Sequence, residues 1–130
     1  MNTLIVCAII AALLPYLAKA PVAIAMNKLD GYDNRHPRAQ QSKLTGFGAR
    51  ALAAHQNSFE SLLIFTIALV VVFASNTITA TTETLAIIYL IARVLYCVCY
   101  YVNWHVLRSS VWLIGLVCPL AMMVVSIQPS

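Results

Sequence analysis

The chain has 130 residues, of which 62% are hydrophobic and only 9% are charged, and its mean hydropathy is +0.85. Because charged residues approach a quarter of a soluble domain, this composition excludes an ordinary soluble protein and indicates that lipid surrounds most of the chain. The formal net charge of +4 comes from basic residues divided between one loop and isolated apolar surroundings, which excludes the clustered basic and aromatic surface of a nucleic-acid-binding protein.

A helix needs about 20 apolar residues to cross a bilayer, so about four spans with short connections use nearly the whole chain. We therefore expect a single domain over residues 1–130, an all-α bundle of four transmembrane helices. The cysteines all lie within apolar runs and are interpreted as small hydrophobic residues, so no metal site is expected. They are Cys7, Cys97, Cys99 and Cys118.

The first span is predicted over about residues 3–26. Pro15 and Pro21 interrupt it, and we expect a kink whose freed backbone groups are satisfied by neighbouring helices. A cleaved signal peptide is the alternative, because residues 18–20 (Ala-Lys-Ala) resemble a small-x-small cleavage site after an apolar run. No Lys or Arg precedes this site and the apolar character resumes after it, which favours a retained span.

Residues 27–45 form the only long polar segment and are predicted to be a loop, since charged side chains are dense there and Gly31 and Pro37 are turn formers. Later apolar runs predict three further spans, at about residues 47–75, 85–104 and 111–127. The turn between the second and third spans contains no Lys or Arg, and a tight connection over about residues 105–110 precedes the fourth.

The charges of these connections predict the orientation. With four spans, the 27–45 loop and the last connection share one side of the membrane, and the other turn lies with both termini. The basic residues of the first side are Lys28, Arg35, Arg38, Lys43 and Arg108. The positive-inside rule makes this side cytoplasmic, so both termini are expected outside the cytoplasm.

Two of the predicted helices carry polar faces. At about 100° per residue, Arg50, Asn57 and Ser61 on the second helix fall within roughly 20° of one direction, and Glu60 lies at the edge of that stripe. On the third helix, spacings of four, three, four and three residues place a second polar set on one face. This set is Tyr89, Arg93, Tyr96, Tyr100 and Asn103.

An unpaired charge inside a bilayer costs from about 3 to more than 10 kcal/mol, so we expect Arg93 to contact Glu60, within one subunit or across a subunit boundary. The alternative is a purely structural pair that fixes helix register. Asn57 and the tyrosines favour a cavity instead, because carboxylate, amide, phenol and guanidinium groups together suit a small zwitterionic ligand, of which glutathione is an example.

Arg108 and Ser109 are expected at the start of the fourth helix, where free backbone N–H groups and the helix dipole favour an anion such as a thiolate. The alternative is that Arg108 is only a positive-inside anchor. His55 lies away from the polar stripe of the second helix, so it is not expected to act as a base.

Three segments of this pattern carry a family resemblance. The run RALAAHQNSFE from Arg50 to Glu60 resembles the membrane-associated proteins in eicosanoid and glutathione metabolism, the MAPEG family, in which an arginine and an alanine-rich turn precede an Asn and an acidic residue. Residues 92–100 resemble the third helix of that family, and Arg108-Ser109 with Trp112 resembles the start of the fourth. The resemblance covers nearly the whole chain, and we expect a bacterial inner-membrane member.

The resemblance implies a homotrimer that binds glutathione as a co-substrate between neighbouring subunits near the cytoplasmic face. It implies that Arg108 stabilises the glutathione thiolate and that Ser109 assists it. The residues implied to bind glutathione are Arg50, Asn57, Glu60, Arg93, Tyr96 and Tyr100. In active relatives the thiolate attacks a lipophilic electrophile, assists an isomerisation or reduces a peroxide.

Three positions depart from the active relatives. Ala53 and Gln56 stand where relatives have arginines that contact a carboxylate, and Trp112 stands where some have a tyrosine. The expected function is a membrane-bound glutathione-dependent transferase or peroxidase that acts on lipophilic electrophiles. The alternative is a non-catalytic scaffold that binds a lipid or a partner, since the family includes such a member. A proton-coupled cation exporter ranks last, because arginines flank the one carboxylate on the second helix.

Overall fold

The structure, a computed structural model, describes residues 1–127, and every regular element in that range is a helix. The helices are α1 (Asn2–Leu17), α2 (Lys19–Asn27), α3 (Pro37–Gln41), α4 (Gly46–Ala74), α5 (Ala80–Tyr101) and α6 (His105–Val125). Four helical stretches are long and apolar enough to cross a membrane, namely α1 with α2, α4, α5 and α6. The predicted all-α membrane bundle is confirmed.

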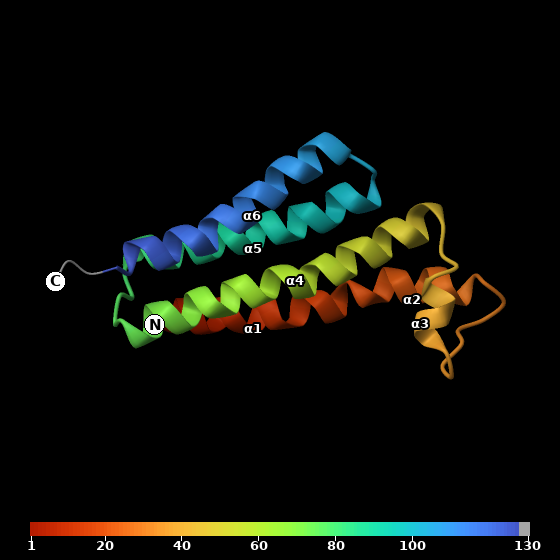
Figure 1. The fold of residues 1–130 in the computed structure, drawn as a ribbon, viewed down its shortest axis with the longest axis horizontal. Helices are drawn as coiled ribbons and strands as arrows, with labels where there is room; N and C mark the ends of the chain where they lie inside the picture. The colour runs from red at the N-terminus through yellow and green to blue at the C-terminus, as the bar shows by residue number, and fades with distance from the viewer. Residues whose placement is uncertain (128–130) are drawn as a thin grey trace.

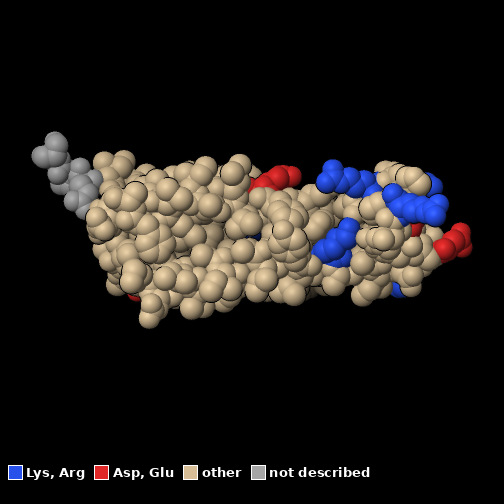
Figure 2. Space-filling view, turned by 90° about the horizontal axis from the view of Figure 1, so that it is seen from below, with Lys and Arg blue, Asp and Glu red and all other residues tan. Residues whose placement is uncertain are grey.

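The helices lie roughly along one axis. The hairpin of α5 and α6 lies on one side of α4, and α1 and α2 lie on the other (Figure 1). The α4–α5 turn and the first residue of the chain lie at one end, whereas the long loop with α3 and the α5–α6 turn lie at the opposite end (Figure 1). Lys and Arg side chains gather at this loop end (Figure 2). The bundle therefore has one basic end.

The first span is broken where the prolines predicted it. Helix α1 stops at Leu17 and α2 starts at Lys19, because Pro21 has no N–H to donate to the carbonyl of Leu17. A neighbouring helix supports the break, since Nδ1 of His55 on α4 lies 2.7 Å from the carbonyl oxygen of Pro15. A carbonyl oxygen only accepts, so Nδ1 carries the proton of this bond.

The long loop is held against the end of α2 by one buried side chain. Nε2 of Gln40 donates to the carbonyl oxygens of Met26, Leu29 and Gly31 at 3.2, 3.4 and 2.8 Å. Its Oε1 accepts from the backbone N–H of Asp33 at 2.9 Å. A polar segment of this length therefore packs as an ordered structure, because one amide satisfies four backbone groups.

The third and fourth spans start earlier than the hydropathy predicted. Helix α5 begins at Ala80 because Thr79 and Thr82 form a capping box in which each side chain accepts the other's backbone N–H. It ends at Tyr101, so Asn103 does not belong to its polar face and instead occupies the turn with φ +61°. Helix α6 then begins at His105 rather than near residue 111.

The main hydrophobic core lies toward the end of the bundle opposite the long loop, where α1, α4, α5 and α6 meet. The rings of Phe65 and Tyr89 stack there with centroids 4.1 Å apart. Three of the cysteines are buried and none forms a disulfide within the described chain, as small hydrophobic residues would behave.

Candidate functional site

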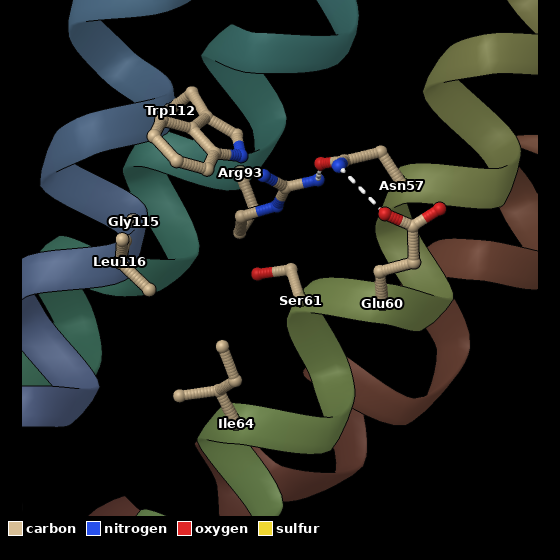
Figure 3. A pocket seen from close by; sticks show the side chains of 8 residues that line it. All are labelled: Asn57, Glu60, Ser61, Ile64, Arg93, Trp112, Gly115 and Leu116. Carbon is tan, nitrogen blue, oxygen red and sulfur yellow. Dashed lines mark hydrogen bonds between the residues drawn. The ribbon is translucent and has the colours of Figure 1, made fainter.

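A pocket of about 450 Å³, including its open mouth, lies between α4 and the α5–α6 hairpin (Figure 3). One wall is polar and consists of Asn57, Glu60 and Ser61 from α4 with Arg93 from α5. The other wall is largely apolar and consists of Ile64 from α4 with Trp112, Gly115 and Leu116 from α6. The pocket thus offers charged groups on one side and a hydrocarbon surface on the other.

Arg93 is the buried charge of this pocket, with only 3% of its surface exposed. Its Nη2 donates to Oδ1 of Asn57 at 2.8 Å, and Nδ2 of Asn57 donates to Oε2 of Glu60 at 3.3 Å. Within one protomer, Arg93 and Glu60 therefore do not form the direct ion pair that the sequence predicted. An amide both accepts and donates, so Asn57 bridges the guanidinium and the carboxylate.

Two further contacts position Arg93. The guanidinium carbon lies 4.2 Å from the centre of the Tyr96 ring, a distance at which the ring face attracts a cation. On the opposite helix, Gly115 leaves room for the arginine stem, since a Cβ at this position would lie 3.2 Å from Cδ of Arg93. The orientation of the guanidinium toward Asn57 follows from these contacts (Figure 3).

Aromatic contacts continue from Arg93 toward the loop end. The Tyr96 and Tyr100 rings meet edge to face with centroids 5.3 Å apart. The guanidinium carbon of Arg108 then lies 4.3 Å from the centre of the Tyr100 ring. Predicted site residues on three different helices, from the binding residue Asn57 to the catalytic residue Arg108, are therefore joined by an unbroken series of contacts.

The remaining predicted residues have backbone partners. Nε of Arg50 donates to the carbonyl oxygen of Tyr100 at 3.1 Å, so this arginine ties α4 to the last turn of α5. Ser109 is exposed, and its hydroxyl donates to the carbonyl oxygen of His105 at 3.2 Å. Arg50 and Ser109 do not line the pocket, and neither do Tyr96, Tyr100 and Arg108. The predicted site residues in its wall are Asn57, Glu60 and Arg93.

Arg108 lies near the start of α6, but its backbone N–H is not one of the free N–H groups there. Because α6 starts at His105, the N–H of Arg108 donates to the carbonyl oxygen of Trp104 at 2.9 Å. The free N–H groups of the helix belong to residues 105–107 instead. The free N–H groups near the predicted site therefore precede Arg108, whose own contribution to binding an anion would come from its half-buried side chain; the anion site itself stays a prediction.

Sequence reasoning missed the apolar wall, although helical spacing contains the signal. Ile64 follows Asn57 by seven residues, and Trp112 and Gly115 follow Arg108 by four and seven, so each lies on a face already marked by a charged or amide residue. Deeper in the bundle, the hydroxyls of Ser61 and Tyr89 lie 3.0 Å apart. The two predicted polar stripes therefore do meet across the α4–α5 interface.

This arrangement can recognise a ligand that carries both charges. The carboxylate of Glu60 is exposed at the mouth of the pocket in the single chain and can accept from an ammonium group. Arg93 uses one donor on Asn57 and retains others for a carboxylate. No group of three His, Cys, Asp or Glu side chains that could hold a metal ion occurs within residues 1–127.

Residues 3–128 match the model of the MAPEG family, which confirms the resemblance carried by the second, third and fourth helices. None of the curated proteins and none of the solved structures matches the chain.

Proposed function

The chain belongs to the MAPEG family, and from this premise we propose that it is a glutathione-dependent transferase or peroxidase that acts on lipophilic electrophiles in the membrane. The observation that carries the proposal is the Arg93–Asn57–Glu60 network beside an apolar wall. Glu60 would accept from the ammonium group of glutathione, and Arg93 would donate to a carboxylate. The apolar wall would receive the electrophile.

Arg108 is the residue proposed to hold the thiolate, because a guanidinium next to sulfur favours the ionised form. In the transfer reaction the sulfur attacks an electrophilic carbon, the sulfur–carbon bond forms, and the leaving group departs with the bonding electrons. In the peroxide reaction the sulfur attacks a peroxide oxygen, the O–O bond breaks, a sulfenic acid forms, and the alkoxide leaves as an alcohol after taking a proton from water. The thiol of a second glutathione then attacks the sulfenic sulfur, which forms the disulfide and releases water. Ser109 would assist only after releasing its bond to His105.

We further propose a homotrimer in a bacterial inner membrane. Glu60 is exposed on the surface of one protomer inside a membrane-spanning helix, where a carboxylate is costly without a partner. A neighbouring subunit would cover it and complete the glutathione site. The basic loop end (Figure 2) would face the cytoplasm, and both termini would lie outside.

The proposal is tested with purified protein in detergent, glutathione, and either a chlorinated aromatic compound or a lipid hydroperoxide. Arg108→Ala should lower kcat about 10²- to 10³-fold, the loss seen when a donor to a developing anion is removed. Lys43→Ala, at the same end but away from the pocket, is the matched control and should retain activity. Absence of turnover, together with absence of thermal stabilisation by glutathione, would refute the proposal.

A non-catalytic scaffold that binds a lipid or a partner is the second candidate. It is favoured by Trp112, which places an indole in the pocket wall where some active relatives have a phenol. This candidate predicts intact oligomers and unchanged lipid binding after Arg108→Ala, with no glutathione-induced rise in thermal stability. Thermal stability with and without glutathione therefore separates the two candidates.

A further inference from the structure

A second and larger pocket opens at the loop end, on the side of α4 that faces α1 and α2. Its volume is about 1060 Å³ including the open mouth. The α1–α2 junction, the long loop with α3, and the first half of α4 form its walls. It shares no residue with the pocket that contains Arg93.

The polar part of this second pocket is cationic. Lys19 and Arg38 line it, and no Asp or Glu does. Lys19 is half-buried at the break in the first span, and it forms no ion pair within residues 1–127. The loop carboxylate of Asp33 lies outside this pocket and accepts from the backbone N–H groups of Arg35 and His36, both at 3.0 Å. A lysine in this setting favours an anion as its partner.

The other part of the pocket is apolar and continues onto an exposed surface of α4. Phe59 lines the pocket, and its ring meets the ring of Tyr16 edge to face at 5.5 Å. The ring of His55, which is held by its hydrogen bond to Pro15, also meets the Phe59 ring edge to face, with centroids 5.3 Å apart. Leu63, one helical turn further along α4, is 65% exposed. An apolar track therefore leads away from the two cations.

The depth of Lys19 matches the edge of the hydrocarbon layer. At about 1.5 Å per residue, roughly 20 residues cross a hydrocarbon core of about 30 Å. Counted from the first turn of α1, this length ends within about one turn of Lys19. The flexible stem of lysine can then place its ammonium group at the level of the lipid head groups.

We propose that this pocket binds an anionic phospholipid, with the phosphate between Lys19 and Arg38 and an acyl chain along Phe59 and Leu63. A basic pocket between helices at the cytoplasmic surface is the expected form of such a site. A free phosphate would use the cations but not the apolar track. This proposal does not depend on the glutathione reaction.

The test measures thermal stability of the purified full chain in mild detergent with added phosphatidylglycerol, phosphatidylcholine or inorganic phosphate. Phosphatidylglycerol alone should stabilise the protein. Lys19→Gln and Arg38→Gln should each raise the half-maximal lipid concentration about five-fold, which corresponds to about 1 kcal/mol per cation. Lys28→Gln and Lys43→Gln, at the same end but outside this pocket, should leave it unchanged.

A second measurement covers variants that fold poorly. Native mass spectrometry counts the phosphatidylglycerol molecules bound to each protein. We expect the same number on the wild-type protein and on Lys19→Arg, and fewer on Lys19→Gln. Equal stabilisation by phosphatidylcholine or by free phosphate would overturn the proposal, as would lipid stabilisation that survives both Gln substitutions. If both Gln variants lose stabilisation by glutathione instead of by lipid, the pocket belongs to the thiol site and the proposal is wrong.

Discussion

The bond between Arg93 and Asn57 should be the strongest single contact between α4 and α5. It is 2.8 Å long, its donor is charged, and Arg93 is 3% exposed. Hydrogen bonds to charged groups contribute about 1.5 to 3 kcal/mol, whereas couplings inside membrane bundles average about 0.6 and reach about 1.7 kcal/mol. The two ranges overlap between about 1.5 and 1.7 kcal/mol, so we expect a coupling free energy of about 1.5 kcal/mol.

A double-mutant cycle measures this coupling. Asn57→Ala and Arg93→Met are made singly and together, and reversible unfolding in mixed micelles gives the free energy of each protein. The bond from Asn57 to Glu60 is lost in both proteins that carry Asn57→Ala, so it cancels in the cycle.

The neutral contact between Ser61 and Tyr89 is the matched control. It joins the same two helices at 3.0 Å, and Ser61→Ala with Tyr89→Phe should give about 0.6 kcal/mol. The Tyr89→Phe variant keeps the stack on Phe65, which limits other losses. A coupling for Arg93 and Asn57 no larger than the Ser61–Tyr89 value would refute the assignment of this charged bond as the main polar link.

Three further changes test the supports of the fold and the site. Gly115→Ala should cost about 1 kcal/mol in unfolding free energy, because the added methyl group would press on Cδ of Arg93 at 3.2 Å; a more stable variant would show that the arginine can yield. Gln40→Leu should lower the local stability of the loop by about 2 kcal/mol and speed its cleavage by protease, whereas Gln41→Leu should not. Thr79→Ala should cost about 1 kcal/mol and accelerate amide exchange in the first turn of α5, and unchanged exchange would contradict the capping role.

Hydropathy predicted the number of spans but not where the helices end. The difference arises because hydropathy marks the residues that lipid surrounds, while a helix ends where its backbone groups find other partners. Thr79 and Thr82 are polar, so hydropathy predicts a turn there, yet their reciprocal bonds start α5. The helical spacing predicts Asn103 on the polar face of the third helix, yet it adopts a left-handed conformation beyond the helix.

Helical periodicity predicted much of the polar wall. Asn57, Glu60 and Arg93 were singled out because their spacing puts them on two faces, and the structure brings these faces together. The family resemblance draws attention to Trp112 without predicting a pocket wall, although its distance of four residues from Arg108 places it on the same face. The second pocket had no comparable signal, since Lys19, Arg38 and Phe59 come from three separate elements.

The sequence by itself determined that this is a four-span membrane protein with two polar helix faces, because burial in lipid and the helical period are properties of local sequence. Only the tertiary structure decided which partner each charge takes. Arg93 binds Asn57 rather than Glu60 because α4 and α5 pack so that the Asn57 amide lies within hydrogen-bond distance of the guanidinium. Gly115 leaves the space that the arginine stem needs. Periodicity places a residue on a face, but the packing of helices determines which side chain across the interface it reaches.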